Sequence, residues 1–475
     1  MSTFVWTDEA VRTALGLRRD LAEPGVSFTR IWTDSRSVAP GDLYVALVGE
    51  RFDGHDFVAD AFARGALGAV VAGPVAGDDA ARLYPVADTL AALGELAAFR
   101  RAALQVPVVG VTGSSGKTTT KDLIAGALGS VQKVHATRAN LNNRVGLPLT
   151  LLAVPDDAQA VVLELGTNEP GEIGALARIA RPEVAVITTV GESHLEGLES
   201  VEGVLEEKLD LLRYRAESGT CIVGDEPAFL ARAAREICPS LRVAGWSADA
   251  DEDLRPATVE MDHWGAFTFA WREVSVALQL PGQHAVTDAL LALAVADTLG
   301  VSPRDAARGI ATVSPRSMRG EWRRIGDLSV LVDCYNANPQ SVRASLDVLE
   351  AQPGGRKVVV LGSMLELGAA SPRLHQEVLA DTLSRDVGLV VATGAFAEAA
   401  TAAGMTDARV RDRILAAPTW QEAYPLLRER LYGDEVILLK ASRGVALEGM
   451  LDLLEADPPQ PQPAGNGVGG AGEEV

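Results

Sequence analysis

A glycine-rich turn between a short apolar strand and a helix constrains this sequence more than any other feature. The residues before it, Val106–Val111, form a nearly continuous apolar run, and those after it, Lys117–Leu128, have a helical composition. The turn reads Gly-Val-Thr-Gly-Ser-Ser-Gly-Lys-Thr-Thr from Gly110 to Thr119. A strand, a glycine-rich turn and a helix in this order are typical of phosphate-binding loops in α/β proteins. The sequence therefore predicts an α/β fold with an anion-binding loop at this turn.

The chemistry of the turn favours a nucleoside triphosphate as its ligand. Its glycines allow the backbone N–H groups to turn inward without Cβ clashes, and the helix N-terminus adds to the anion cradle. Lys117 supplies a positive charge for the β- and γ-phosphates, and Thr118 or Thr119 offers a hydroxyl to Mg²⁺. The expected ATP-binding residues of the turn are Gly113, Ser114, Ser115, Gly116, Lys117, Thr118 and Thr119.

The turn departs from the strict P-loop pattern at one position. That pattern has glycine where Val111 stands, so the turn fits a Thr-Gly-x-x-Gly-Lys-Thr-Thr variant. The alternative interpretation is a glycine-rich turn followed by a surface lysine that binds nothing. The strand, the helix, the lysine and the threonine triplet together favour the phosphate loop.

Short apolar runs and helical stretches alternate on both sides of this turn. In the central segment the expected strands after the turn are Val161–Leu165, Val184–Val190 and Cys221–Val223. The helical stretches there are Lys117–Leu128, Glu172–Ile179, Val201–Leu212 and Val286–Leu299. Strands that are apolar throughout are typical of a parallel sheet with helices on both faces.

The flanking segments follow the same pattern. The first has expected strands at Leu43–Leu47 and Ala69–Val71, a helix near Phe57–Gly65, and a helix at Asp88–Leu104 with Asp88 as its N-cap. The third has four expected strands, which suggests a Rossmann-like layer. They are Ser329–Val332, Lys357–Leu361, Leu389–Thr393 and Glu435–Leu439. This segment lacks a Gly-x-Gly-x-x-Gly turn, so we assign it no dinucleotide.

We therefore expect an α/β protein with three domains, which agrees with the prior of about three for this length. The expected ranges are 1–105, 106–313 and 314–455. The remaining residues, 456–475, are rich in Pro, Gly and acidic residues and are expected to be disordered.

Charge and cysteine content exclude several classes of function. The 475 residues carry a formal net charge of −21, and an acidic chain repels phosphate backbones, so we expect no nucleic-acid partner. The three cysteines match no zinc or redox spacing and suit a reducing compartment. No apolar run reaches the ~18 residues of a membrane span, and the first residues lack a signal-peptide pattern. These features predict a cytoplasmic protein without a membrane partner.

The phosphate turn resembles the ATP loop of the Mur ligases of peptidoglycan synthesis. Further motifs extend this resemblance from about Trp32 to Leu451. The runs Thr33–Leu47 and Gly49–Phe57 are similar to the UDP-sugar-binding domain of the family. The residues that this resemblance places against uridine and diphosphate are Ser35, Arg36, Arg51 and the turn Asp53–His55. Ordinary turn chemistry is the alternative interpretation of these residues.

Two central motifs carry the resemblance toward the reacting groups. The run Asn140–Thr150 resembles a substrate-facing loop of the branch that adds D-alanyl-D-alanine to UDP-N-acetylmuramoyl-tripeptide, which implies that Asn142 and Asn143 contact substrate. The family has glycine where Ala139 stands. Glu164 opens a Glu-Leu-Gly motif at the end of a buried strand, where a carboxylate needs a partner. Mg²⁺ on ATP would supply that partner, and a structural salt bridge is the alternative.

Two further residues are expected metal ligands. His194 stands just past a buried strand, and neutral imidazole is a competent ligand. Lys208 aligns with the lysine that family members carbamylate, which would give a second Mg²⁺ an anionic ligand. An unmodified surface lysine is the alternative for Lys208. The run Leu280–Leu290 resembles the adenine-binding segment of the family. Here Ala285 and Asp288 replace the two asparagines that the family has in this segment.

The third segment contains three runs that resemble the signatures of the same branch. They are Val332–Pro339, Leu361–Gly368 and Lys440–Gly444. In these runs Ser363 replaces an aspartate of the family and Ala441 a glycine. The resemblance implies that Asp333 and Asn336 touch ribose or phosphates, that Arg319 reaches the γ-phosphate, and that Lys440 and Ser442 meet substrate.

Taken together, the resemblance implies a monomeric, ATP-dependent ligase with two Mg²⁺ ions. It would join D-alanyl-D-alanine to UDP-N-acetylmuramoyl-tripeptide through an acyl phosphate, with Lys117, Glu164, His194, Lys208 and Arg319 as its catalytic residues. Folylpolyglutamate and cyanophycin-type ligases share the loop, but the run Asn140–Asn143 and the run Asp333–Pro339 count against them. The ligase that adds the third peptide residue carries a different third-segment signature. A P-loop switch ATPase needs no UDP-sugar domain, so the run Thr33–Phe57 counts against it.

Overall fold

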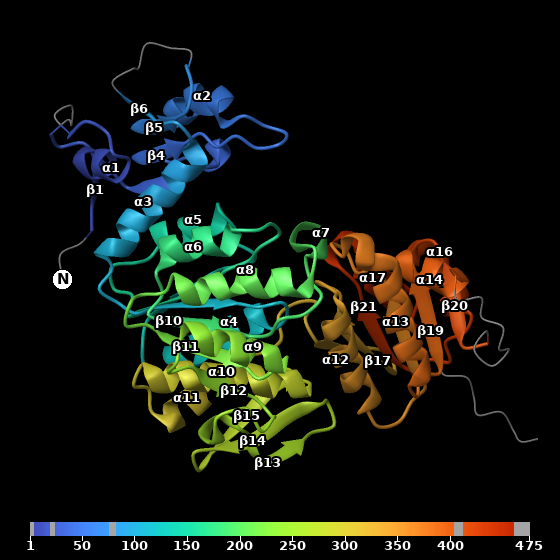
Figure 1. The fold of residues 1–475 in the computed structure, drawn as a ribbon. Coiled ribbons are helices and arrows are strands. Elements are labelled where there is room, and N and C mark those ends of the chain that lie inside the picture. The colour runs from blue at the N-terminus through green and yellow to red at the C-terminus, as the bar shows by residue number, and fades with distance from the viewer. Residues whose placement is uncertain (1–3, 20–23, 76–81, 403–411, 460–475) are drawn as a thin grey trace, which may run out of the picture.

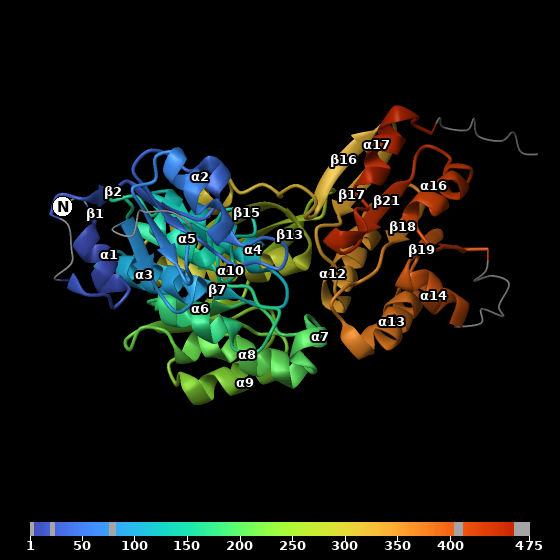
Figure 2. The same ribbon diagram turned by 90° about the horizontal axis from the view of Figure 1, so that it is seen from above.

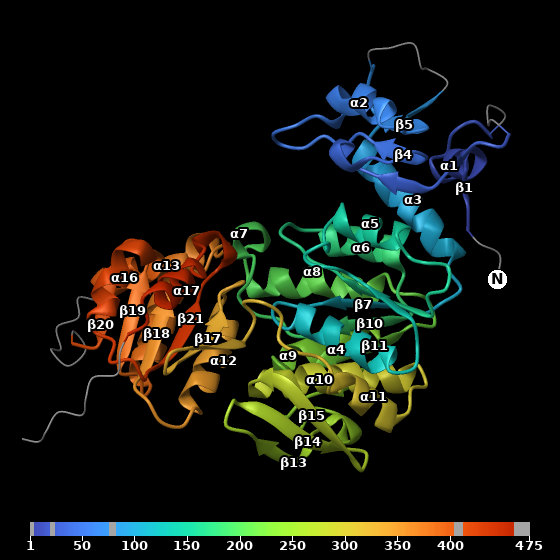
Figure 3. The same cartoon turned by 180° about the vertical axis from the view of Figure 1, so that it is seen from behind.

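The structure is a computed structural model that describes residues 4–19, 24–75, 82–402 and 412–459. Its elements gather into three bodies (Figures 1–3), each built on a β-sheet. The N-terminal body lies above the central one in Figure 1, and the C-terminal body lies beside it. The α/β class and the three-part architecture predicted from the sequence are therefore confirmed.

The N-terminal body contains a four-stranded parallel sheet in the order β3-β4-β5-β6. Its strands are Arg30–Trp32, Asp42–Val45, Gly68–Val71 and Leu83–Pro85. Helix α2 (Val58–Ala63) lies in this body, together with an antiparallel pair of short strands, β1 (Trp6–Thr7) and β2 (Ser27–Phe28), whose connection contains helix α1 (Asp8–Ala14). Helix α3 (Thr89–Ala103) leads to the central body, and Asp88 caps its first turn as predicted.

The central body is a six-stranded parallel sheet in the order β12-β11-β10-β7-β9-β8. In chain order its strands are β7 (Val108–Thr112), β8 (Val134–Ala136), β9 (Ala160–Glu164), β10 (Val184–Ile187), β11 (Thr220–Gly224) and β12 (Arg242–Ala244). Three of these six strands, β7, β9 and β10, are buried along their whole length, which explains their continuous apolar sequence.

Helices cover both faces of this sheet, as the sequence predicts. One face carries α5 (Gly146–Leu152), α6 (Glu172–Ala180), α8 (Val201–Arg213) and α9 (Ala228–Ile237). The other carries α4 (Lys117–Gly129), α10 (Gln283–Thr298) and α11 (Pro303–Ile310). The two faces bury separate hydrophobic clusters, so the sheet is the middle layer of three.

A three-stranded antiparallel sheet extends the central body and was not predicted. Its strands are β13 (Ala257–Met261), β14 (Ala266–Trp271) and β15 (Val274–Pro281). Strand β13 is exposed along its whole length, and β15 alternates between buried and exposed residues. These strands therefore lack the continuous apolar runs by which the other strands were recognised.

The C-terminal body has a six-stranded sheet in the order β16-β17-β21-β18-β19-β20. Its strands are β16 (Glu321–Ile325), β17 (Leu328–Asp333), β18 (Lys357–Leu361), β19 (Leu389–Thr393), β20 (Ile414–Ala417) and β21 (Val436–Lys440). Only β16 is antiparallel. The helices are α12 (Pro339–Glu350), α13 (Ser371–Ser384), α14 (Ala395–Ala402), α16 (Trp420–Arg428) and α17 (Gly449–Ala456).

Two remaining predictions concern the ends of the chain and the membrane. Helix α17 runs to Ala456, one residue into the predicted tail, and residues 460–475 of that tail lie outside the described residues. Within the described ranges, no helix is long and apolar enough to cross a membrane.

Candidate active site at the phosphate loop

The predicted phosphate loop joins β7 to α4, and its geometry requires glycine at two positions. Gly113 and Gly116 have φ angles of 155° and 80°. A Cβ on Gly113 would lie 1.8 Å from the hydroxyl oxygen of Thr188, and one on Gly116 would lie 2.5 Å from a carboxylate oxygen of Asp288. The backbone can take this tight course only without side chains at these positions. The loop ends at the N-terminus of α4, where backbone N–H groups favour an anion.

Lys117 is the first residue of α4, and its side chain folds back over the loop. Its Nζ atom donates a hydrogen bond to the carbonyl oxygen of Gly113 at 2.7 Å. Burial lowers the pKa of Lys117, and the charge of Glu164 opposes that shift. Two groups from beyond the central domain also act on this pKa: Arg319 lowers it and Glu366 raises it. The charged groups of all these elements therefore meet around Lys117.

The two serines of the loop face the third domain. Asn338, at the start of α12, donates its side-chain amide to the backbone oxygen of Ser114 and to the hydroxyl of Ser115, both at 3.4 Å. The hydroxyl of Ser114 also accepts hydrogen bonds from Gly191 N at 3.0 Å and from Ser193 at 2.8 Å. The serine hydroxyls thus tie the loop to its neighbours in this conformation.

Glu164 lies at the carboxyl end of β9 and is only 2% exposed. One carboxylate oxygen, Oε1, accepts a hydrogen bond from Asn142 at 2.8 Å. The other, Oε2, is buried and accepts no hydrogen bond from any described residue, and the nearest cation, Lys121, lies 4.0 Å away. A buried carboxylate oxygen without a partner is costly, so this position is suited to an additional cation.

His194 begins the short helix α7 (Leu195–Leu198) with a left-handed φ of 53°. Its Nδ1 atom lies 2.7 Å from Oε2 of Glu366, which belongs to the third domain. Burial lowers the pKa of His194, so the neutral ring that a metal requires is favoured at neutral pH. Charges on Lys117 and Lys208 act in the same direction, which shows that the three predicted groups are electrostatic neighbours.

Lys208 lies on α8 and is 1% exposed. Among the described residues, no side-chain hydrogen bond or ion pair holds its amine. Burial lowers the pKa of Lys208 well below its usual range, and the positive charge of Lys117 lowers it further. Burial without a hydrogen-bond partner favours the neutral form of this amine, which is the form that reacts with electrophiles. The alternative of a surface lysine is wrong for this residue.

The predicted residues of the third domain range from exposed to buried, with Arg319 and Asp333 half-buried. Asn336 is exposed, and the guanidinium of Arg319 lies over the ring of Tyr335, 3.9 Å from its centroid. Asp333 instead accepts hydrogen bonds from Lys440 at 2.6 Å and from Ser345 at 2.5 Å, and Lys440 lowers its pKa against the effect of burial.

Lys440 and Ser442, which were predicted to meet substrate, are 2% and 1% exposed. The amine of Lys440 also donates to the backbone oxygen of Asn336 at 3.0 Å. The hydroxyl of Ser442 accepts from Leu365 N at 2.9 Å and donates to the backbone oxygen of Ala337. Both side chains therefore hold neighbouring loops together in this conformation, and neither presents a free polar group to a ligand.

The predicted substrate residues of the other two domains lie in well-defined turns. Asn143 uses its side-chain oxygen to accept from Gly146 N at 2.9 Å at the start of α5, which leaves its amide nitrogen for a ligand. Ser35 and Arg36 lie in the N-terminal body, where Arg36 is exposed and pairs with Asp34 at 2.8 Å. The structure thus separates these first-domain residues from the phosphate loop.

Asp288, which the resemblance places at adenine, lies beneath the phosphate loop. It is 4% exposed and accepts a hydrogen bond from Thr120 at 2.8 Å, and its Oδ1 is the group that a Cβ on Gly116 would strike. Its other oxygen is buried without a hydrogen-bond partner among described residues, and burial raises the pKa of Asp288 to about 7. Asp288 therefore supports the phosphate loop from below, and Ala285 beside it is buried as well.

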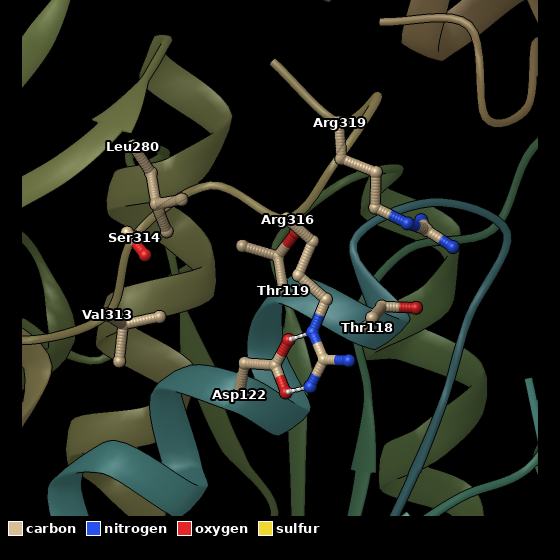
Figure 4. Close-up of a pocket in the computed structure, with 8 residues that line it drawn as sticks. All are labelled: Thr118, Thr119, Asp122, Leu280, Val313, Ser314, Arg316 and Arg319. Carbon is tan, nitrogen blue, oxygen red and sulfur yellow. Dashed lines mark hydrogen bonds and ion pairs between the residues drawn. The ribbon is translucent and has the colours of Figure 1, made fainter. Parts of the chain in front are cut away.

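A small cleft opens beside α4, between the phosphate loop and the segment that leads to the third domain (Figure 4). It is lined by Thr118, Thr119, Asp122, Leu280, Val313, Ser314, Arg316 and Arg319. The sequence did not identify Asp122, Arg316, Lys121 or Glu366 as site residues. Lys121 and Asp122 carried one usable signal, since they follow the threonine triplet directly, whereas Arg316 had none.

No cluster of three His, Cys, Asp or Glu side chains suited to a metal occurs in the described part of the chain. The potential protein ligands are spread over the loop, β9, α7 and α8 instead. Such a set is incomplete by itself, and phosphate oxygens would have to complete it.

Known proteins match this chain over nearly its whole length. Three family models match consecutive segments: "Mur ligase family, catalytic domain" at residues 27–101, "Mur ligase middle domain" at 111–296 and "Mur ligase, glutamate ligase domain" at 318–443. The UDP-N-acetylmuramoyl-tripeptide--D-alanyl-D-alanine ligase of Bacillus subtilis is 36% identical over 430 residues, which cover 89% of this chain and 93% of that protein. The ligase of the same name from Escherichia coli is 33% identical over 449 residues, which cover 92% of this chain and 96% of that protein.

Solved structures agree with these relatives. A crystal structure of MurF from Acinetobacter baumannii superposes with a TM-score of 0.87 at 33% identity, covering 96% of this chain and all of that one. MurF from Thermotoga maritima in complex with ADP gives a TM-score of 0.77 at 27% identity, covering 90% and 97%. The phosphate loop, the buried carboxylate at β9 and the buried amine on α8 thus lie in a fold and a sequence that both match one family over all three domains. The chain belongs to the Mur ligase family.

Proposed function

We propose that this protein is an ATP-dependent ligase that joins D-alanyl-D-alanine to UDP-N-acetylmuramoyl-tripeptide. The observation that carries the proposal is the buried, unpartnered carboxylate oxygen of Glu164, which ends the strand that pairs with β7 beside the phosphate loop. The relatives with this printed activity, which match about nine-tenths of the chain, select the substrates. The product would be the UDP-linked muramoyl-pentapeptide.

The residues at the loop fit ATP with Mg²⁺. Backbone N–H groups of the loop and the ammonium of Lys117 would hold the phosphates, and Thr118 or Thr119 with Glu164 would hold one Mg²⁺. The unpartnered Oε2 of Glu164 supports this assignment, because a cation satisfies it. When bound, Mg²⁺ would neutralise the charge that collects on the phosphates.

A second Mg²⁺ would be held by His194 and by a carbamate on Lys208. The carbamate forms when the neutral amine attacks carbon dioxide: an N–C bond is made and one proton is released. The buried amine of Lys208, which no described residue binds, supports this modification. It would convert a cationic group into an oxygen ligand that suits Mg²⁺.

The chemistry follows from the need to activate a carboxylate. The terminal carboxylate of the tripeptide attacks the γ-phosphorus of ATP, the bond to ADP breaks, and an acyl phosphate forms. The amine of D-alanyl-D-alanine then attacks the carbonyl carbon and loses a proton, and phosphate leaves from the tetrahedral intermediate. Lys117 and Arg319 would neutralise the moving phosphoryl charge. Contacts such as Asn338 with Ser114 would keep water from the acyl phosphate.

Substrate recognition is assigned by domain. Residues 1–105 would bind the UDP-sugar through groups such as Ser35 and Arg36, residues 106–313 would bind ATP, and residues 314–455 would close over the site. Asn142 would link substrate to catalysis, because its side chain already donates to Glu164. The free amide of Asn143 would meet the peptide or the sugar.

Phosphate release from ATP tests the proposal. Release is expected only when UDP-muramoyl-tripeptide and D-alanyl-D-alanine are both present. Release that needs neither would instead favour the second candidate, a P-loop ATPase that joins no substrates. Release with UDP-muramoyl-dipeptide and a free diamino acid would assign the chain to the third-residue ligases of the same family.

A further inference from the structure

The turn that connects the central and third domains is fastened to the phosphate-loop helix by an arginine. Arg316 lies between the two family matches that end at residue 296 and begin at residue 318. Its guanidinium makes two contacts with the carboxylate of Asp122 on α4 (Figure 4); the NH2–Oδ1 contact is 2.6 Å, and Nε contacts Oδ2. The two residues are 194 positions apart, so this pair joins the connecting turn to the nucleotide site.

Arg316 and Arg319 are the two ends of one turn. The backbone N–H of Arg319 donates to the carbonyl oxygen of Arg316 at 3.0 Å, which closes a four-residue turn. Met318 and Gly320 have left-handed φ angles of 62° and 68°, so this course of the chain needs outside contacts to hold it. Arg316 therefore fixes one end of the turn that brings Arg319 to the cleft, where the guanidinium of Arg319 lies over the ring of Tyr335.

Asp122 is itself held from the buried side by a lysine. Lys121 is fully buried, lies 3.1 Å from Oδ1 of Asp122, and donates to the carbonyl oxygen of Thr137 at 2.9 Å. Its Nζ is 4.0 Å from Oε2 of Glu164. Positive and negative groups therefore alternate from Arg316 through Asp122 and Lys121 to Glu164, and they connect the turn to the expected metal ligand.

We propose that Arg316 and Asp122 are positioning residues: their ion pair clamps the connecting turn against α4 and so aims Arg319 at the triphosphate. This inference rests on the proposed use of ATP. Neither residue needs to touch ATP for the clamp to act. Any loss on breaking the pair should arise through Arg319, which reaches the same cleft.

The alternative is an ordinary surface ion pair with no effect on the site. The side chain of Arg316 is 46% exposed, and exposed pairs contribute little to folding stability. However, Asp122 is only 16% exposed, has a bidentate arginine partner, and shares a buried lysine. Bidentate pairs fix geometry more than they add stability, which is the property that a clamp requires.

The test measures nucleotide binding and turnover in the full-length enzyme. For Arg316→Ala and for Asp122→Asn, we expect the Kd of a non-hydrolysable ATP analogue with Mg²⁺ and the KM for ATP to rise roughly tenfold. The KM values for both acceptors should stay within a factor of two or so of wild type. The double variant should bind no more weakly than either single variant, because both remove the same contact. Arg316→Lys keeps the charge but not the two-point contact, so it should restore only part of the affinity.

The decisive comparison uses Arg319. If the pair acts by aiming this residue, Arg316→Ala should add no further loss in an Arg319→Ala background. Independent losses that multiply would overturn the proposal, and so would unchanged nucleotide affinity in both single variants. Arg308→Ala is the matched control, because Arg308 pairs with Asp305 at 2.7 Å on α11, away from the connecting turn. The nucleotide affinity of Arg308→Ala should equal that of wild type.

Failure of the two proposals is distinguishable. If wild type binds the ATP analogue but joins no substrates, the proposed ligase function is wrong while the clamp is still tested by binding. If wild type ligates and the variants bind nucleotide normally, the clamp alone is wrong.

Discussion

Glu164 is a buried, charged side chain whose two carboxylate oxygens have different surroundings. Oε1 is held by Asn142, which orients the carboxylate, and Oε2 remains for a cation. Glutamine at this position would keep the hydrogen bond from Asn142 and the shape of the side chain. It would remove only the negative charge, which makes it a cleaner test than alanine.

For Glu164→Gln we therefore expect a loss of about 10²-fold or more in kcat/KM and a higher Mg²⁺ requirement, because a phosphate-site charge is lost. Steady-state phosphate release at a series of Mg²⁺ concentrations measures both. Lys117→Ala should lose at least as much. Turnover close to wild type in either variant, with an unchanged melting temperature, would refute the assignment of the site.

Asp288 makes a second prediction at the residue scale, on stability rather than activity. Its pKa is raised to about 7 in the folded protein, so the folded state keeps a proton that the unfolded state releases near pH 4. Folding stability should therefore fall as the pH rises from about 4 to about 7 and then level off. Asp288→Asn keeps the acceptor for Thr120 and removes this titration. The free energy of unfolding of the variant should rise relative to that of wild type over this pH range, by up to about 4 kcal/mol at pH 8.

Urea unfolding of wild type and Asp288→Asn at pH 5 and pH 8 checks this difference. The advantage of the variant should be larger at pH 8. Asp157→Asn is a suitable control, since Asp157 forms only a surface pair with Lys133. A constant difference between the two proteins at both pH values would show that Asp288 is ionised in the fold.

At the scale of elements, Asn338 serves a helix and a domain contact at once. It caps α12 through a reciprocal pair with Ser341, and its amide reaches Ser114 and Ser115 of the phosphate loop. Serine is a competent N-cap but is too short to make the second set of contacts. The two roles are therefore separable by substitution.

Asn338→Ala should lose about 1 kcal/mol of folding stability and also activity. Asn338→Ser should retain most of the stability but still lose activity, because the loop contact is gone. Chemical denaturation and kcat/KM for ATP, measured on the same preparations, separate these effects. Full activity in Asn338→Ser would mean that the contact with the loop has no part in turnover.

The elements that the sequence predicts best are those buried on both faces. The expected strands Lys357–Leu361 and Leu389–Thr393 coincide with β18 and β19. Strand β13 was missed because all of its residues are exposed, so no apolar run marks it. Lys117 and Glu164 could be singled out for a related reason, since one stands at a helix start and the other at the end of a buried strand.

Other site residues could not be predicted, because their roles depend on contacts between distant segments. Arg316 meets Asp122 only when the connecting turn folds back onto α4, and Glu366 meets His194 only after the third domain packs against the central one. The contact of Asp288 with the loop was equally unpredictable, because α10 packs against α4 and buries this side chain beneath Gly116.

At the scale of the whole molecule, small polar and ring contacts hold the third domain against the central one. His194 meets Glu366, Thr189 donates to Gln340 at 3.1 Å, and Asn338 meets the phosphate loop. On the far side of the cleft, Trp322 of β16 donates its indole N–H to the carbonyl oxygen of Trp264 at 2.9 Å, with ring centroids 5.9 Å apart. None of these contacts is large, so closure should be sensitive to losing any one of them.

The tryptophan contact offers the clearest test of closure, because it lies outside the catalytic groups. Trp322→Ala removes both the ring packing and the hydrogen bond, so the third domain should spend more time away from the loop. We expect a larger radius of gyration by X-ray scattering without nucleotide and a KM for ATP raised by roughly threefold to tenfold. Saturating ATP analogue should restore compaction, since binding favours the closed state. Trp322→Phe keeps the ring packing, so its radius of gyration and its KM for ATP should lie between those of wild type and Trp322→Ala. A compact, fully active Trp322→Ala would show that the remaining contacts close the molecule without the tryptophan contact.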